Sequence, residues 1–488
     1  MGIFDRFRSA GHAVSGNNES KPASSDHDAM QLIDDGHVLE AEGRIEEARQ
    51  HYLDAILLAP NLAQAHLNLG NFLLATGDLK GALNSFSTAI KHNPDYAGAY
   101  YNIGNALLCN GQLDEAMANY RNALKINPDY AEVHCVQGIV LKELGQHEGA
   151  VASFHRALEI NPDLAEANYN LATLLLSKGH YAEAWRKYEA RYHPNINGNY
   201  VSLPQVPFPQ WQGEPLYGKS LMIWPEQGFG DEIQFARYIP LLKDLGASHI
   251  TLVCKPPLQT LFKTLKGVEL VIPQPEAASL PLHDYWALSM SLPLHFATTV
   301  ETIPAKLPYL GIPPEHMNRW RNRLPPDGLK VGLVWKGSSG HKNDAHRSLP
   351  GLATFAPLWS VPRITFVSLQ KGQGEHEAAM PPAGQPIMDI GSGIQDFADT
   401  AACIIQLDLV ICIDTAIAHL AGALGKPCWV LLPASGTDWR WLRDRADTHW
   451  YPGVMRLFRQ QRAGDWAATV VEISKALRTW VDEHQHQL

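Results

Sequence analysis

The sequence predicts an α-helical solenoid followed by an α/β region made of two half-domains. Three observations predict it: a repeat with a period of 34 residues in the N-terminal part, a proline-rich stretch after it, and short apolar strands alternating with helical segments in the remainder. At 488 residues the chain is long enough for roughly three domains.

The composition is that of a globular protein, with 45% hydrophobic and 18% charged residues. A net charge of -10 argues against a nucleic-acid partner, because phosphate binding relies on clustered Lys and Arg. We expect no membrane span and a cytoplasmic location, since the chain shows neither a long uncharged apolar window nor the apolar core of a signal peptide. The six cysteines are scattered, which favours buried reduced thiols over disulfides or metal.

Residues 1–28, rich in Ser, Asn, Gly and charge, are expected to form a flexible segment, and residues 29–196 contain five copies of one unit. The period is kept by prolines, by glycines and by aromatic residues: Pro60, Pro94, Pro128 and Pro162; Gly43, Gly77, Gly111, Gly145 and Gly179; Tyr52, Phe86, Tyr120, Phe154 and Tyr188.

The pattern of each unit predicts two helices. The repeated glycine lies in the turn between them, and the repeated proline ends the second helix. A small residue in the first helix lets the two helices approach closely while the aromatic ring fills the gap beside them; these are Gly36, Gly70, Gly104, Gly138 and Ala172. The pattern resembles the tetratricopeptide repeat. Such hairpins cannot bury their apolar faces alone, so we expect a superhelix whose first helices line a concave groove.

Asparagines recur in register on the predicted first helices: Asn68, Asn102 and Asn170 at one position, and Asn71 and Asn105 one turn further on. Their amides could donate to and accept from the backbone of an extended peptide, which predicts a groove for a protein or peptide acceptor. Alternatively, these polar residues cover a solvated face. The resemblance to the asparagine ladder of the eukaryotic protein O-linked N-acetylglucosamine transferase favours the groove.

Residues 197–218 are expected to be a proline-rich linker, and residues 219–322 and 328–462 to be two α/β halves joined by a short hinge. The first half begins with the strands "SLMIW" and "HITLVC", separated by a helical stretch that Pro240 should kink or end. The second contains "KVGLVW", "RITFVSL", "DLVICI" and "PCWVLL". Residues 463–488 are expected to be a C-terminal helix and tail. Ligands of open parallel sheets bind at the carboxyl ends of strands, which predicts a site in a cleft between the halves.

The loop after the first predicted strand contains Gly228, Gly230 and Asp231. The two glycines could let the backbone approach a ligand closely. Asp231 could cap the following helix, or its carboxylate could face the cleft and act as a general base. The glycine pair favours the second interpretation. The preceding Glu226 and Gln227 are equally available to the cleft.

Asp414 and Thr415 end an apolar strand and open a helix, whose free N–H groups could bind an anion. His419 lies one turn further on the same helix face as Thr415. The alternative is that Asp414 caps the helix and His419 packs against a neighbour.

A third loop, residues 335–350, carries Lys336, Lys342, His346 and Arg347 after a strand. Flexible cations at that place suit a diphosphate, although such charges are usually solvated. The tryptophans within residues 437–458 could stack on a base or a sugar, or could simply pack.

The segments "GFGDEIQFARYIPLL" and "DTAIAHLAGALGKP" resemble the two domain motifs of the lipopolysaccharide heptosyltransferase superfamily, and the resemblance extends over about residues 220–460. It implies a GT-B fold, metal-independent transfer from a nucleotide sugar, a base at Asp231, and diphosphate contacts at Thr415 and near His419. Ala416 stands where the family motif usually has glycine. The lysine that the resemblance implies is assigned to Lys342 first and then to Lys336, with Arg347 in support.

The whole chain is similar to bacterial tetratricopeptide proteins with a glycosyltransferase-like C-terminal region. We therefore expect a cytoplasmic, inverting glycosyltransferase that uses a nucleotide sugar as substrate, requires no cofactor and no metal, and modifies a protein or peptide held by the repeats. One alternative is a scaffold that has lost transfer activity. Another is a sugar-nucleotide enzyme of the same fold that does not modify proteins.

Overall fold

The computed structural model describes residues 24–484 except 195, 197–202, 275–279 and 342. The chain forms two compact units, one of residues 1–174 with 193–199 and one of residues 175–192 with 200–488. None of the described helices combines the length and apolarity that crossing a bilayer requires. None of the six cysteines forms a disulfide, and five of them are buried, as the sequence predicts, whereas Cys109 is partly exposed.

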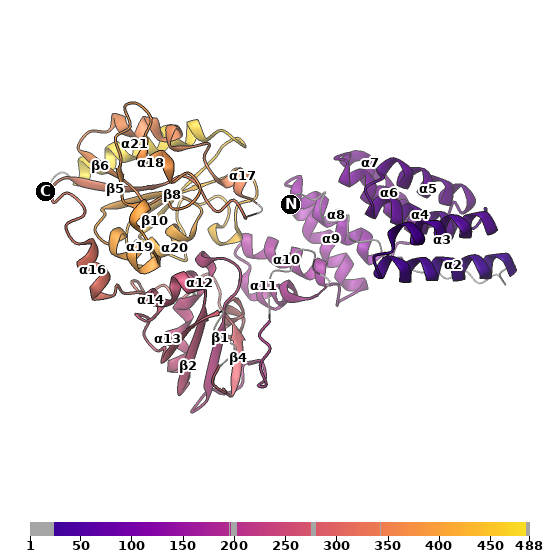
Figure 1. The fold of residues 1–488 in the computed structure, drawn as a ribbon, viewed down its shortest axis with the longest axis horizontal. Coiled ribbons are helices and arrows are strands. Elements are labelled where there is room, and N and C mark those ends of the chain that lie inside the picture. The colour runs from indigo at the N-terminus through magenta and orange to yellow at the C-terminus, as the bar shows by residue number, and fades with distance from the viewer. Residues whose placement is uncertain (1–23, 195, 197–202, 275–279, 342, 485–488) are drawn as a thin grey trace. The chain divides into compact units, whose positions relative to one another are not determined.

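The first unit is a series of helical hairpins, drawn in indigo and purple in Figure 1. Successive pairs are α2 (Ser24–Ala41) with α3 (Ile45–Leu58), α4 (Ala63–Ala75) with α5 (Leu79–His92), α6 (Ala97–Cys109) with α7 (Leu113–Ile126), and α8 (Ala131–Glu143) with α9 (His147–Ile160). Helix α10 (Ala165–Ser177) continues into the second unit. The first helix begins at Ser24, earlier than the expected end of the flexible segment at residue 28.

The predicted pairing of a small residue with an aromatic ring is confirmed in the four hairpins of this unit. A Cβ atom added to the glycine of each first helix would lie 2.4–2.8 Å from the ring on the second helix, in the pairs Gly36 and Tyr52, Gly70 and Phe86, Gly104 and Tyr120, and Gly138 and Phe154. Real Cβ atoms do not approach so closely, so only glycine permits this helix spacing. The turn glycines have positive φ, for example 90° at Gly77.

The second unit begins with α11 (Tyr181–Tyr188) and the 3₁₀ turn η1 (Glu189–Tyr192), which the sequence assigned to the fifth repeat. Its first half contains a parallel sheet in the order β3-β2-β1-β4. The strands are β1 (Ser220–Trp224), β2 (His249–Cys254), β3 (Leu270–Pro273) and β4 (Tyr285–Leu288), and the accompanying helices are α12 (Phe229–Phe235), η2 (Ala236–Tyr238), α13 (Ile239–Asp244), η3 (Pro256–Leu258), α14 (Gln259–Phe262), η5 (Ser289–Ser291), α15 (Leu292–His295) and α16 (Pro314–Trp320).

Pro240 breaks the helical stretch after β1, as expected, because α12 ends in a 3₁₀ turn and α13 restarts with Pro240 in its first turn. The proline-rich segment is less of a linker than predicted. Its C-terminal part packs onto the first sheet: the Trp211 backbone N–H donates to Trp286 O at 2.7 Å, and Phe208 and Trp211 are buried. The extended chain thereby covers part of β4.

The second half contains a six-stranded parallel sheet in the order β10-β9-β8-β5-β6-β7. The strands are β5 (Leu329–Val334), β6 (Ile364–Ser368), β7 (Met388–Asp389), β8 (Leu409–Ile413), β9 (Cys428–Leu432) and β10 (Met455–Arg459). The helices are α17 (Asp344–Arg347), η6 (Leu352–Ser360), α18 (His376–Ala379), η7 (Gly391–Gly393), α19 (Phe397–Ile404), α20 (Ala416–Ala423), η8 (Trp439–Trp441) and α21 (Trp466–His484).

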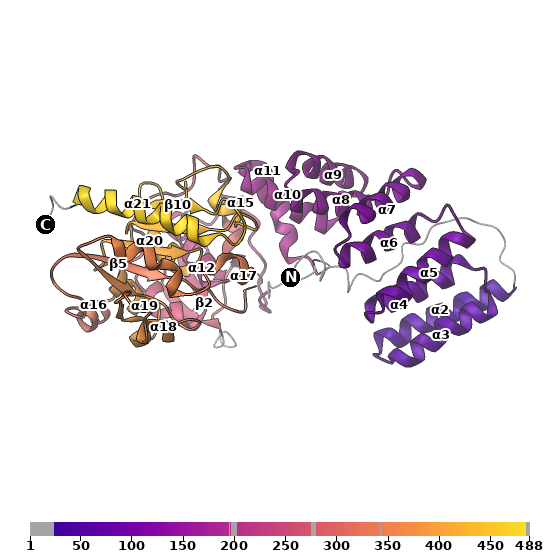
Figure 2. The same ribbon diagram turned by 90° about the horizontal axis from the view of Figure 1, so that it is seen from above.

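The sheet of the second half is covered on both faces, which explains its nearly continuous apolar strands. Alternate residues such as Leu333 and Ile411 pack against η6 and α21, while α19 and α20 lie on the opposite face (Figure 1). Figure 2 shows α21, in yellow, running along this half. The C-terminal segment is therefore part of the core of the second half. The predicted α/β architecture with parallel sheets is confirmed in both halves.

Candidate functional site

Charged side chains meet where the loops after β1, β5, β8 and β9 come together. Each loop starts at the carboxyl end of a parallel strand, which is the edge where the sequence predicts a site. The contributing residues are Asp231 after β1, Arg347 after β5, Asp414 and Thr415 after β8, and Asp438 and Arg440 after β9, and we call this set the charged cluster.

Asp231 lies in the first turn of α12, three residues after the N-cap residue Gly228. Its Oδ2 accepts a hydrogen bond from the Gly228 backbone N–H at 2.8 Å, and its Oδ1 accepts one from the Arg440 guanidinium. The carboxylate thus stabilises the helix terminus and also forms an ion pair with the second half. A carboxylate has about four lone-pair sites, so these two bonds leave room for a substrate proton.

Arg440 is buried and holds two carboxylates at once. Besides Asp231, it donates to both oxygens of Asp438, at 2.9 and 2.8 Å. Burial lowers the pKa of Arg440, but the carboxylates of Asp438 and Asp231 outweigh burial and raise it. The guanidinium is therefore a permanent positive charge between the halves.

The junction of β8 and α20 carries the features expected of an anion site. Arg347 Nη1 donates to the Asp414 carbonyl at 3.1 Å, which places the guanidinium beside the start of α20. Thr415 Oγ1 is a buried polar atom that has no hydrogen-bond partner among the described residues, and Arg347 Nε has none either, although it lies 3.6 Å from Asp344 Oδ1 in an ion pair. A buried polar atom without a hydrogen bond destabilises the fold, unless a bound group forms a hydrogen bond with it.

Asp414 does not cap α20, because Thr415 occupies the N-cap position. Burial and the neighbouring Asp438 carboxylate raise the pKa of the Asp414 carboxyl to about 6, against the opposing effects of Trp441, Arg347 and Arg440. Asp414 therefore changes charge near neutral pH.

Gly230 and His419 do not have the roles that the sequence suggested for them. A Cβ atom on Gly230 would lie 2.7 Å from His419 Cδ2, so this glycine lets α12 pack against α20 and does not receive a ligand. His419 is buried, its Nδ1 lies 3.0 Å from the Tyr451 hydroxyl, and its ring stacks on Trp441. These contacts favour the alternative interpretation of His419 as a packed side chain.

Of the two candidate lysines, Lys336 is described by the structure and is not part of the charged cluster. The aliphatic stem of Lys336 lies beside Gly374 in the loop after β6, and none of the recorded contacts of Lys336 reaches Asp414 or Thr415. Lys342 lies outside the described residues. Among the predicted cations that the structure describes, Arg347 is the one that lies in the cluster.

Most of the predicted groove asparagines are buried and already bonded within the first unit. Asn71 Oδ1 accepts from Asn102 at 2.7 Å, and Asn105 Oδ1 accepts from the Tyr120 hydroxyl at 2.8 Å. Asn170 Oδ1 accepts from the Lys142 amine at 2.7 Å. Asn68 donates to the Gln64 carbonyl, but its own buried Oδ1 has no partner among the described residues. A peptide would have to replace some of these bonds.

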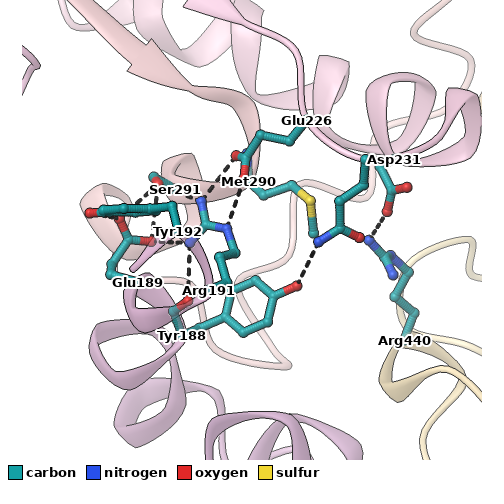
Figure 3. A network of polar contacts seen from close by, with 10 residues as sticks. Tyr188, Glu189, Arg191, Tyr192, Glu226, Asp231, Met290, Ser291 and Arg440 are labelled. Carbon is teal, nitrogen blue, oxygen red and sulfur yellow. Dashed lines mark hydrogen bonds and ion pairs between the residues drawn. The ribbon is translucent and has the colours of Figure 1, made fainter. Parts of the chain in front are cut away.

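A second polar network lies next to the charged cluster and is drawn in Figure 3. Arg191 donates to both oxygens of Glu226, at 2.8 and 3.0 Å, and to the Ser291 hydroxyl at 2.7 Å. Arg191 and Glu226 are both buried. Glu226 is thus a structural partner of η1 and is not available to a ligand, contrary to expectation.

The tryptophans of residues 437–458 pack and do not form an open stacking surface. Trp439 and Trp450 are buried against Tyr181 and Trp185 of α11. Trp450 Nε1 donates to the Tyr181 hydroxyl at 3.0 Å, and Trp185 Nε1 donates to the Thr298 carbonyl at 2.8 Å. Helix α11 therefore binds both halves of the second unit.

The sequence interpretation missed Asp438, Arg440 and His341. Desolvation by neighbouring atoms and the Arg347 charge lower the pKa of His341, although this residue is exposed, and the carboxylates of Asp438 and Asp231 act in the opposite direction. The signal for Arg440 was present but was overlooked: "DWRW" follows the strand β9, and charged residues just after a parallel strand lie at the ligand edge of the sheet.

His316, Asp396 and Asp399 form a separate group whose ligand atoms lie within 4.8 Å of one another. The Asp399 carboxylate already accepts from Trp320 Nε1 at 2.6 Å and from Arg319 at 3.1 Å. A guanidinium at that distance opposes a metal ion, so the donor set fits an internal ion-pair network better.

The first unit can be identified by comparison with known proteins. Residues 36–77, 70–111, 104–145 and 138–179 match the model of the TPR repeat family. The first unit is a TPR domain. The crystal structure of a thermophilic TPR protein from Thermus thermophilus is 28% identical, with coverage of 35% of this chain and 93% of that chain and a TM-score of 0.31. YrrB, described as a TPR protein with an unusual peptide-binding site, is 24% identical, with coverage of 34% and 84% and a TM-score of 0.26.

A relative that extends beyond the TPR domain is Protein FlbA of Caulobacter vibrioides, which is 32% identical over 330 residues. The match covers 63% of this chain and 54% of FlbA, so the chain spans about half the length of that relative.

Proposed function

We propose that this protein is a glycosyltransferase that moves a sugar from a nucleotide-sugar donor to a protein acceptor. The observation that carries the proposal is the charged cluster, in which the carboxylate of Asp231 in the first half pairs with Arg440 of the second half, while Arg347 of the second half lies beside the start of α20. An acid facing cations at the carboxyl ends of two parallel sheets supports a GT-B type of active site.

In this proposal the donor diphosphate binds at the junction of β8 and α20. Arg347, the Thr415 hydroxyl and the first N–H groups of α20 supply a cation and hydrogen-bond donors for its oxygens. Arg440 adds a second cation. Two guanidinium groups provide charge neutralisation that a divalent metal would otherwise provide, which is why we propose metal-independent transfer.

In the transfer step, the oxygen of an acceptor hydroxyl attacks the anomeric carbon of the sugar. The bond from that carbon to the diphosphate oxygen breaks, the hydroxyl proton passes to the Asp231 carboxylate, and the nucleoside diphosphate leaves with the bonding electron pair. Arg347 and Arg440 stabilise the negative charge that develops on the leaving group. Direct displacement inverts the configuration at the anomeric carbon.

The TPR domain is proposed to hold the acceptor. Stacked TPR hairpins bind extended segments of other proteins, and the partly exposed Asn102 offers an amide group for a peptide backbone. A bound peptide would replace the internal hydrogen bonds of the asparagines with hydrogen bonds to its own backbone. Because every residue has the same backbone groups, such binding would tolerate many sequences.

A non-catalytic TPR scaffold is the second candidate, and a specific observation favours it. The Asp231–Arg440 ion pair and the contact of Gly230 with His419 fill the space between the halves where a donor would enter. In a non-catalytic scaffold, these two contacts would serve only to stabilise the fold. A sugar-nucleotide enzyme that does not modify proteins would use the charged cluster but would need no TPR partner.

Thermal denaturation of the full chain with UDP, GDP, CDP and dTDP separates these candidates. The proposal expects one of them to raise the melting temperature of the wild type and of Asp231→Asn, but not of Arg347→Met. Arg445→Met is the matched control, because Arg445 pairs with Asp447 at the surface. If none of the four nucleotides changes the melting temperature, the scaffold is favoured.

Intact-mass analysis of proteins from cells that express the wild type or Asp231→Asn then tests transfer. A hexose-sized or larger mass increment should appear on an acceptor protein with the wild type and fall at least ~100-fold with Asp231→Asn. Full transfer by Asp231→Asn would disprove the role of the base. Nucleotide binding and turnover without any modified protein would favour the enzyme that does not act on proteins.

A further inference from the structure

Gln227 has an unusual backbone for a residue of its type. It lies in the loop from β1 to α12 with φ of 52°, a left-handed conformation that a side chain with a Cβ atom rarely adopts. It is also exposed, between the buried Glu226 and the N-cap Gly228. Residues held in such conformations cluster at sites where the geometry serves a function.

The neighbours of Gln227 force this conformation. Glu226 is fixed by the two bonds from Arg191 and by the Met290 backbone N–H, which donates to its Oε1 at 2.8 Å. The Gln227 carbonyl accepts from the Lys255 amine at 2.6 Å, and the Gly228 N–H donates to Asp231. Three consecutive residues are therefore each held by a different partner.

The side chain of Gln227 is held much less firmly than its backbone. Its recorded contact is from Nε2 to the Tyr188 hydroxyl at 3.5 Å, which is long for a hydrogen bond. Figure 3 shows the two anchors of the loop on either side, Arg191 with Glu226 and Arg440 with Asp231. The loop thus carries an exposed residue whose carboxamide is weakly held, four residues before Asp231.

We propose that Gln227 binds the acceptor, and that its carboxamide pairs with the peptide group next to the hydroxyl that is modified. This proposal rests on the proposed function. A carboxamide offers one carbonyl acceptor and an NH₂ donor, which match the N–H and C=O of a peptide backbone. Asp231 lies on the same rigid loop, so an acceptor held by Gln227 has its hydroxyl delivered to the base.

Gln227→Gly tests this directly, because glycine removes the carboxamide and accepts the left-handed backbone without strain. Gln227→Asn keeps a shorter carboxamide on a residue type that tolerates this conformation. Arg363→Gly is the matched control, since Arg363 is another exposed long side chain with positive φ, 67°, that lies outside the charged cluster.

The measurements are the melting temperature, the melting shift with the nucleoside diphosphate that stabilises the wild type, and transfer kinetics on the acceptor protein found by mass analysis. Gln227→Gly is expected to melt no lower than the wild type and to keep the nucleotide shift, while KM for the acceptor rises at least ~10-fold. Gln227→Asn should recover part of that loss. Arg363→Gly should change the melting temperature alone.

Two results overturn the proposal while leaving the proposed function intact: wild-type KM in Gln227→Gly, or a lower melting temperature together with a lost nucleotide shift, which would indicate a structural role. If the wild type itself binds none of the nucleotides and modifies no protein, the proposed function fails, and the role of Gln227 falls with it.

Discussion

Arg440, in the second half of the α/β unit, donates a hydrogen bond to the carboxylate of Asp231 in the first half. The same guanidinium binds Asp438 of its own half, so one buried cation joins an acid from each side. A diphosphate that enters this place would compete for the same guanidinium. The Arg440–Asp231 ion pair therefore has two effects: it stabilises the α/β unit, and it occupies one oxygen of the proposed base, Asp231.

Arg440→Met should destabilise the protein, because it leaves Asp231 and Asp438 without their common cation. Breaking a fully buried ion pair costs about 3–5 kcal/mol. Both acids retain some solvent exposure, so we expect a loss of about 2–3 kcal/mol in the free energy of unfolding, measured by urea denaturation. Arg445→Met should stay within about 0.5 kcal/mol of the wild type. Equal losses for the two variants would contradict the structural role of Arg440.

Gly230→Ala should cost about 1–3 kcal/mol of unfolding free energy, since its Cβ atom would collide with the His419 ring. Gly228→Ala is a milder comparison: its Cβ atom would lie 3.3 Å from Asp231 Oδ2, which requires that carboxylate to shift slightly, and its φ of -92° suits alanine. In a His419→Ala background the cost of Gly230→Ala should shrink, which a double-mutant cycle measures. A cost that is the same in both backgrounds would show that the two residues do not interact.

Gly104→Ala and Gly98→Ala, both in α6, should have opposite effects. A Cβ atom on Gly104 would lie 2.4 Å from the Tyr120 ring, whereas one on Gly98 would make an ordinary contact of 3.6 Å. We expect Gly104→Ala to destabilise the TPR domain by at least about 1 kcal/mol and Gly98→Ala to stabilise it by about 0.5–1 kcal/mol. Thermal unfolding followed by circular dichroism compares them. Stabilisation by Gly104→Ala would refute the proposed reason for the repeated glycine.

Asp414 should make stability depend on pH. Its folded-state pKa, about 6, lies above the value of about 3.9 for an unfolded chain. Its contribution to stability is thus complete below about pH 4 and is lost as the pH rises through about 6. Asp414→Asn should remove this loss and stabilise the protein at pH 7 by on the order of 2 kcal/mol. Melting temperatures from pH 4 to 8 test this, and parallel curves for the two proteins would contradict it.

The parts of the fold that depend on local patterns were predictable. Gly70 and Phe86 recur with the repeat period, and their contact follows from the geometry of one hairpin. Strands such as β8 and β9 are buried on both faces, so their apolar runs stand out in the sequence. The place of the site was also predictable, because loops after parallel strands meet at one edge of a sheet.

Contacts between distant segments could not be predicted in the same way. The sequence around His419 allows both a ligand and a packed ring, and the position of Gly230 on another helix decides between them. The role of Arg440 depends on Asp231, which lies 209 residues away. Similarly, the sequence around Glu226 suggests a side chain that could contact a ligand. Its ion pair with Arg191, which lies 35 residues away, buries it instead.

The position of α11 affects how this protein can be recombined with others. By sequence period it closes the fifth repeat, but Tyr181 and Trp185 bind both α/β halves and Arg191 holds the loop that precedes the proposed base. A chimera with a foreign solenoid joined at the proline-rich segment would remove these side chains and expose the aromatic surface they cover. Exchange of binding specificity therefore requires a junction within α10, so that the α/β unit keeps α11.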